Sequence, residues 1–216
     1  EVGGVTQLSR TLAALEEAGA DRIVVNTHHH ADQIQASLAE RSHRAEVLVS
    51  REEPAALETG GGLVNARNLF DPGAPILVHN VDIISTIDLG RLMSVHAASS
   101  DLATLAVQER PASRYLLFDD QGLQGRVDVR DGRRQDSRPA RQVVRRFAFS
   151  GVHVVSARVF DLVEERGAFS VIDLYLRLAG VGETIRPFDV SSATWFEVGT
   201  PERLEAARSA FEPPVP

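Results

Sequence analysis

The sequence predicts an α/β protein in which helices cover a parallel sheet, organised as a single domain over residues 1–216. Three observations favour this fold. Short apolar runs, typical of strands buried on both faces, alternate with segments whose apolar residues recur at helical spacing. Short links containing glycine or proline join the two kinds of segment. The length of 216 residues suits one domain with one hydrophobic core.

In chain order, the first half alternates helices and strands. The expected segments are a helix over 5–15, a strand over 23–26, a helix from 32 to 38, a strand over 47–49, a helix from 63 to 69 and a strand over 76–82. Three adjacent histidines, His28, His29 and His30, follow the first strand. Adjacent residues do not converge on one ion, so a metal site there is disfavoured.

The second half begins with a helix capped by Asp88 and then turns to strands. The expected segments are strands over 102–107, 115–118, 123–129 and 147–155, helices over 159–163 and 170–178, an outer strand over 184–188 and a last helix that starts at 200–201. The arginine-rich stretch 130–141 is expected to be a solvated loop, with phosphate contacts as the alternative.

Composition limits the possible functions. The chain has no cysteine, which excludes disulfides and thiolate chemistry and fits a reducing, cytoplasmic location. No apolar run approaches the length of a membrane span, and the sequence shows no signal peptide, so no membrane partner is expected. The net charge of −7 argues against nucleic acid as a partner. All 23 basic residues are arginines.

The strand 76–82 is the centre of the predicted site. Its apolar run stops on Asn80 and Asp82. Ligands in open α/β sheets bind beyond the carboxyl ends of strands, and an aspartate there can hold a divalent cation that in turn holds phosphate oxygens. The alternative is that Asp82 only caps a loop or the next helix.

Two glycine-containing stretches are further candidates for binding. Three consecutive glycines, residues 60–62, open an apparent helix, where backbone N–H groups can face an anion or a base edge. A binding loop is favoured there over a flexible loop, because the stretch lies one element before Asp82. Ser150 and Gly151 interrupt a strand, where a bulge or a close ligand can sit.

Four motifs in this order resemble those of the sugar-1-phosphate nucleotidyltransferases, including the mannose-1-phosphate guanylyltransferase-like and N-acetylmuramate-1-phosphate uridylyltransferase-like groups. They are residues 57–62 (LETGGG), 77–82 (LVHNVD), 149–151 (FSG) and 195–202 (WFEVGTPE). Each motif is weak alone, but the four together cover essentially the whole chain. The resemblance implies a Rossmann-like three-layer α/β/α sandwich of the GT-A type, with a mixed, mostly parallel central sheet.

The resemblance also implies an activity and its residues. The reaction is nucleotidyl transfer from a nucleoside triphosphate to a sugar-1-phosphate, with Mg²⁺ as cofactor and a nucleotide sugar and pyrophosphate as products. The base, the sugar and the oligomeric state stay open. The implied residues are Asp82 (catalytic and metal-binding), Glu197 (metal-binding, where the family usually has Asp), Glu53, Leu57, Glu58, Thr59, Gly60 and Gly61 (nucleotide-binding), and Asn80, Ser150, Gly151 and Asp173 (sugar-phosphate-binding). For Asp173, an ordinary polar helix residue is an equal alternative.

One family signature is absent from this sequence. The glycine-rich N-terminal segment with its Pro-Lys-Pro motif does not occur, and the chain contains no lysine to replace it. The expectation is that the sequence, which starts at Glu1, is N-terminally incomplete and inactive as it stands. Two alternatives remain open. One is a GT-A glycosyltransferase that uses residues 80–82 as a degenerate Asp-x-Asp motif, and the other is an inactive regulatory domain that binds nucleotide sugars.

Overall fold

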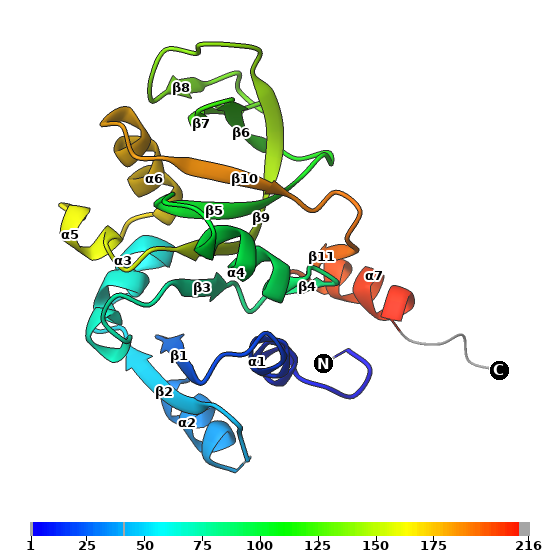
Figure 1. The fold of residues 1–216 in the computed structure, drawn as a ribbon. Coiled ribbons are helices and arrows are strands. Elements are labelled where there is room, and N and C mark those ends of the chain that lie inside the picture. Colours follow the sequence, from blue (N-terminus) through cyan, green and yellow to red (C-terminus); the bar gives the residue numbers. More distant parts are fainter. Residues whose placement is uncertain (1, 41, 212–216) are drawn as a thin grey trace.

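The computed structural model describes residues 2–40 and 42–211, and it confirms the expected alternation of helices and strands in the first half (Figure 1). In order, the elements are α1 (Gln7–Glu17), β1 (Arg22–Thr27), α2 (Ala31–Ala39), β2 (Glu46–Arg51), α3 (Glu58–Asn65), the 3₁₀ turn η1 (Arg67–Leu69), β3 (Ile76–His79), β4 (Ile83–Ser85) and α4 (Leu89–Ala97). The Asp88 side chain caps α4 by accepting a hydrogen bond from the Arg91 backbone N–H at 2.8 Å.

The second half supplies most strands of the main sheet. Its elements are β5 (Ala103–Gln108), β6 (Arg114–Asp119), β7 (Gly122–Asp128), β8 (Arg134–Asp136), β9 (Arg145–Val155), α5 (Val159–Leu162), α6 (Val171–Gly180), β10 (Ile185–Asp189), β11 (Trp195–Glu197) and α7 (Pro201–Phe211). In the described part of the chain, no helix is long and apolar enough to cross a membrane.

The main sheet is mixed and largely antiparallel, so the prediction of a mostly parallel sheet was wrong. Its order is β10-β5-β9-β6-β7-β8, and β3 also pairs with β9. Among the described residues, only β10 and β5 pair in parallel within it, whereas β1 and β2 form a separate parallel pair. An apolar run buried on both faces has the same composition whichever way its neighbours run, so the sequence pattern did not reveal the direction.

Strand β5 lies in the middle of the core. All six of its residues are buried, and alternate side chains enter opposite layers. Leu105 and Val107 pack into a cluster with α6, while Ala106 packs into a second cluster with α4. Helices therefore cover both faces of the sheet, as the sandwich prediction required (Figure 1).

The arginine-rich stretch 130–141 is not a simple loop, because it contains the short strand β8. Several of its arginines form ion pairs with nearby carboxylates. The pairs are Arg130–Asp128, Arg133–Asp131, Arg134–Asp136 and Arg138–Asp119. Three of these pairs join residues two positions apart, whereas Arg138–Asp119 connects the segment after β8 to the end of β6.

Strand β9 positions the candidate site, because it divides one of its edges between two partners. Residues 152–155 pair with β3, and residues 145–147 pair with β6. On the other edge the register with β5 shifts, since Leu105 pairs with His153 and Val107 with Phe149. The predicted interruption at Ser150–Gly151 is therefore a bulge, and Gly151 has a φ of +75°. A cleft opens where β3 and β6 diverge.

Candidate active site

The fold brings Asp82 and Glu197 together, although 115 positions separate them in the sequence. Strands β4 and β11 pair antiparallel with Glu197 opposite Ile83, and the Val198 N–H donates to the Asp82 carbonyl at 2.8 Å. A Cβ added to Gly199 would lie 2.6 Å from Glu197 Oε1 and 3.6 Å from Asp82 Oδ2. Both carboxylates thus converge beside the Gly199 backbone, which has no side chain to separate them.

The Glu197 carboxylate already has partners in the protein. Its Oε1 accepts a hydrogen bond from the Gly199 N–H at 3.2 Å, and its Oε2 forms an ion pair with Arg203 of α7. A cation at Glu197 would therefore compete with Arg203. No cluster of three or more acidic, histidine or cysteine side chains occurs among the described residues. Two carboxylates nevertheless fit Mg²⁺, which binds few protein ligands and completes its shell with water and substrate phosphates.

The two carboxylates line a cleft of about 660 Å³ between the end of β3, the β5–β6 connection, the β9 bulge and α7. Two predicted sugar-phosphate residues, Asn80 and Gly151, also line it. The Asn80 N–H donates to the Gly151 carbonyl at 2.9 Å. A Cβ on Gly151 would lie 3.0 Å from the Ile83 side chain and 3.2 Å from Asn80 Nδ2, so a larger residue here would crowd the cleft.

The other two predicted sugar-phosphate residues lie elsewhere. The Ser150 side chain is fully buried, and its hydroxyl has no hydrogen-bond partner in the described structure. Its carbonyl accepts a hydrogen bond from the Trp195 indole N–H at 2.9 Å. Asp173 lies in the first turn of α6, forms an ion pair with Arg126 of β7 at 2.6 Å, and is not part of the cleft lining.

Sequence reasoning missed Arg110, a half-buried cation in the cleft. Its guanidinium carbon lies 3.7 Å from the centre of the Trp195 ring, and its Nη2 donates to the Phe149 carbonyl at 3.1 Å. Its Nε is buried without a partner, and no described carboxylate pairs with it. Burial lowers the pKa of Arg110, and the charge of Arg203 lowers this pKa further, while Tyr115 raises it. The available signal was an Arg-Pro pair soon after a buried strand.

The three glycines of the LETGGG motif lie within α3 and do not form a loop before it, so the loop prediction was wrong. The N–H groups of Gly60 and Gly61 donate to the Phe169 carbonyl at 2.9 and 3.3 Å. These two amides are therefore occupied by the protein itself. A Cβ on Gly60 would lie 2.4 Å from the Phe169 ring, and a Cβ on Gly61 would lie 2.3 Å from the Gly167 carbonyl oxygen. Glycine occurs at these two positions because neighbouring segments pack closely against the helix, and not because the backbone must be flexible there.

The remaining predicted nucleotide residues surround the start of α3. Leu57 donates its N–H to Glu52 Oε2 at 2.8 Å, and Thr59 accepts from the Val171 N–H at 3.1 Å. Glu53 and Glu58 are exposed, and Glu58 has a positive φ of 58°. None of the six predicted nucleotide residues lines the Asp82 cleft. The buried Glu52, which the sequence analysis did not select, anchors this region from the end of β2.

In this cleft of a mixed α/β fold, two carboxylates lie near Arg110, which pairs with no described carboxylate, and such a combination suits phosphate-bearing ligands. No family model matches the chain. It is 29% identical to the N-acetylmuramate alpha-1-phosphate uridylyltransferase of Caulobacter vibrioides, over 97% of this chain and 85% of that protein. It is 28% identical to the enzyme of the same name from Neisseria meningitidis serogroup B, over 97% and 86% of the two chains. Over nearly its whole length the chain is therefore similar to sugar-1-phosphate nucleotidyltransferases.

Solved structures share the fold. HddC from Yersinia pseudotuberculosis, in its complex with GMP-PN, superposes with a TM-score of 0.74 at 20% identity, covering 98% of this chain and 88% of that one. The fold is therefore the α/β fold of the nucleotidyltransferases, with the largely antiparallel sheet described above. Because the alignments cover about 85% of the relatives' length, the comparison does not support the expectation that this chain is inactive.

Proposed function

We propose that this protein transfers a nucleotidyl group from a nucleoside triphosphate to a sugar-1-phosphate, releasing pyrophosphate. The observation that carries the proposal is the convergence of Asp82 and Glu197 beside Gly199, in a cleft that also contains Arg110. The names of the two relatives suggest UTP and N-acetylmuramate 1-phosphate as the first pair to test.

The proposed reaction depends on aligning the two substrates and neutralising their phosphate charges more than on proton transfer. The attacking oxygen belongs to the phosphate of the acceptor and is already anionic, so no strong general base is required. Asp82 and Glu197 are the side chains that would hold Mg²⁺. When bound, the ion supplies neutralisation of the phosphate charges that otherwise repel each other.

Other residues of the cleft have separate tasks. Arg203 neutralises Glu197 in the structure described, and it lies where a phosphate could take over that interaction. Asn80 and Gly151 shape the cleft beside Asp82, and Arg110 offers an unpaired positive charge to an anionic group of the acceptor. The LETGGG helix, with Glu53 before it, is proposed to contact the nucleotide base through side chains or free backbone groups, since Gly60 and Gly61 donate to Phe169.

The direct test is release of pyrophosphate with Mg²⁺, using UTP, GTP, CTP and dTTP against a panel of sugar-1-phosphates. Release that requires both substrates supports the proposal and identifies base and sugar together. If folded protein releases no pyrophosphate with any pair but hydrolyses or binds a nucleotide sugar, the glycosyltransferase or regulatory alternative replaces it.

A further inference from the structure

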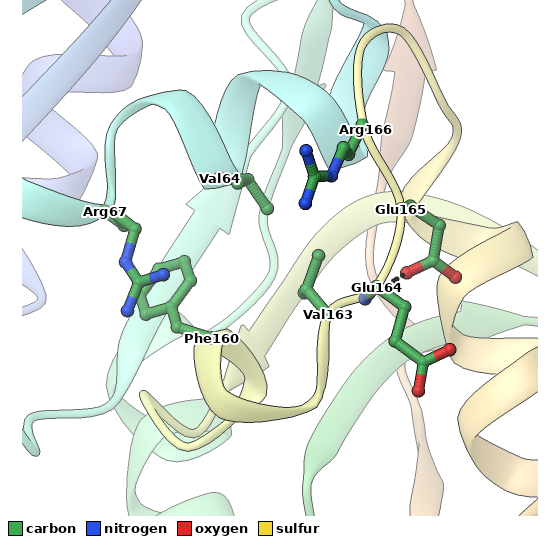
Figure 2. A pocket seen from close by; sticks show the side chains of 7 residues that line it. All are labelled: Val64, Arg67, Phe160, Val163, Glu164, Glu165 and Arg166. Atoms are coloured by element: carbon green, nitrogen blue, oxygen red, sulfur yellow. Dashed lines mark hydrogen bonds between the residues drawn. The ribbon is translucent and has the colours of Figure 1, made fainter.

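A second pocket, of about 410 Å³, lies outside the Asp82 cleft and shares no lining residue with it. Its wall is formed by the end of α3 with η1 on one side and by α5 and the segment that follows it on the other (Figure 2). The lining residues used below are Val64, Arg67, Phe160, Val163, Glu164 and Arg166. None of them has a role in the proposed reaction.

Two arginines of this pocket have no ionic partner in the part of the chain that the structure describes. Among the described residues, neither the Arg67 nor the Arg166 side chain forms an ion pair or a hydrogen bond. The guanidinium carbon of Arg67 lies 5.5 Å from the centre of the Phe160 ring, which holds it at the pocket wall. Figure 2 shows Arg67 and Arg166 on opposite sides of Val64, with Val163 below Arg166. The pocket therefore combines two guanidinium groups with an apolar floor.

The acids of the same segment do not neutralise these arginines. Both carboxylate oxygens of Glu165 bind Arg177, at 2.6 and 2.8 Å. The Arg177 guanidinium also donates to the Leu162 carbonyl at 2.9 Å, which fixes the pair behind the pocket. The Glu164 carboxylate is exposed and points away from Arg67 and Arg166 (Figure 2). Positive charge is thus in excess where the two arginines face the pocket.

We propose that this pocket is a second ligand site, which binds a small organic phosphate. Guanidinium groups bind phosphate oxygens through paired N–H donors, so Arg67 and Arg166 are the groups that would hold the phosphate. The apolar or ring part of the ligand would rest on Val64 and Val163. The volume is within the range of small-molecule sites.

The pocket lies next to α3 and next to the segment that packs against this helix. Arg67 follows this helix closely, and Arg166 precedes Gly167 and Phe169, whose carbonyl groups contact Gly61 and Gly60. A phosphate held by both arginines would tie this segment to the helix. An effect of the ligand on nucleotide affinity then follows, and this effect, unlike the binding itself, rests on the proposed function.

The test is calorimetric titration of the full chain with phenyl phosphate and with inorganic phosphate. We expect phenyl phosphate to bind more tightly than inorganic phosphate, and the double variant Arg67→Gln/Arg166→Gln to weaken phenyl phosphate binding roughly 10-fold or more. The matched control is Arg91→Gln, because Arg91 lies over Phe188 at 5.9 Å much as Arg67 lies over Phe160. This control should bind like the wild type.

Several outcomes would overturn the proposal. They are no binding to the wild type, equal binding by the double variant, and equal affinity for the two probes. Loss of binding in Arg110→Gln instead would place the phosphate in the Asp82 cleft. If the double variant does not fold, the single variant of the exposed Arg166 provides the same comparison. Since binding is measured without turnover, failure here is distinct from failure of the transferase assay.

Discussion

At the scale of single residues, Arg110 is the side chain on which the proposed binding of an anionic acceptor most depends. A partly buried cation is normally paired, yet this one stacks on Trp195, donates to a carbonyl and has no carboxylate partner in the described chain. The nearby charge of Arg203 adds repulsion, which is one cause of its lowered pKa. An anionic ligand would relieve both effects.

Replacing Arg110 by Gln should therefore impair acceptor binding selectively. Charge-assisted hydrogen bonds contribute about 1.5–3 kcal/mol, so we expect KM for the sugar-1-phosphate to rise roughly 10- to 100-fold, with KM for the nucleotide little changed. Steady-state kinetics with each substrate varied in turn would measure this. Arg114→Gln is the control, because Arg114 lines the same cleft but pairs with Asp128 at 3.2 Å. Equal effects on both KM values would contradict the assignment.

Asp82 should be essential for turnover and dispensable for folding. Asp82→Asn removes one of the two converging carboxylates at almost constant volume, and we expect kcat/KM to fall by about 100-fold or more. Asp120→Asn, a change of the same type at an exposed position, should leave the rate unchanged. Pyrophosphate release, with thermal unfolding as a check on folding, compares the two. Full Mg²⁺-dependent activity in Asp82→Asn would remove the basis of the proposed site.

At the scale of elements, α3 shows how packing can override helix propensity. Glycine weakens an isolated helix, yet three glycines occur in this one because neighbouring segments approach its backbone closely. At Gly61 the approaching atom is the Gly167 carbonyl oxygen, which cannot rotate away as a side chain can. Glycine is therefore required at this position for steric reasons.

This predicts that Gly61→Ala destabilises the protein although alanine is the better helix former. The added methyl group would meet backbone, and overpacking of this kind costs about 1–3 kcal/mol of the free energy of unfolding. Gly90→Ala in α4 is the matched control, since its nearest contact would be an ordinary 3.6 Å to the Asp88 carboxylate. Urea unfolding of both variants decides the question. A Gly61→Ala protein as stable as Gly90→Ala would contradict this prediction, because it would show that the 167–169 segment can move away from the added methyl group at little cost.

At the scale of the whole molecule, the central sheet contains a buried histidine at the junction of β3, β5 and β9. His153 is 2% exposed, both ring nitrogens lack partners in the described structure, and the ring packs against Phe149 and Tyr175. Burial lowers the pKa of His153 to about 3. The folded protein therefore keeps this side chain neutral at pH values where the unfolded chain protonates it.

The neutral, buried His153 makes the stability of the folded protein depend on pH. Between its unfolded pKa of about 6.5 and its folded pKa of about 3, the unfolded state binds the extra proton, so stability falls as the pH falls. From pH 7 to pH 5, protonation of this one group in the unfolded chain should lower the free energy of unfolding by about 2 kcal/mol. His153→Phe should lose correspondingly less stability over that range, as measured by urea unfolding at both pH values. His29→Phe, at an exposed position, should keep the wild-type dependence, and an unchanged slope in His153→Phe would contradict the argument.

Much of the fold could be predicted from the sequence because the relevant signals are local. Apolar periodicity located β1, β2, β5 and β9, and side-chain chemistry identified capping residues such as Asp88. The same locality limited the site prediction. Asp82 and Asn80 stand out at the end of their own strand, whereas Arg110 becomes meaningful only beside Trp195, which lies 85 positions away in the chain.

The sequence by itself determined the order of helices and strands, the buried strand that ends before Asp82, and the family resemblance carried by four motifs. Only the tertiary structure decided which way the strands run, that the glycines of α3 lie within a helix, and that Asp82, Glu197 and Arg110 share one cleft. The physical reason is the range of the forces involved. Backbone propensity and periodicity act over a few residues, whereas strand pairing, close packing and charge compensation join residues that are distant in the chain.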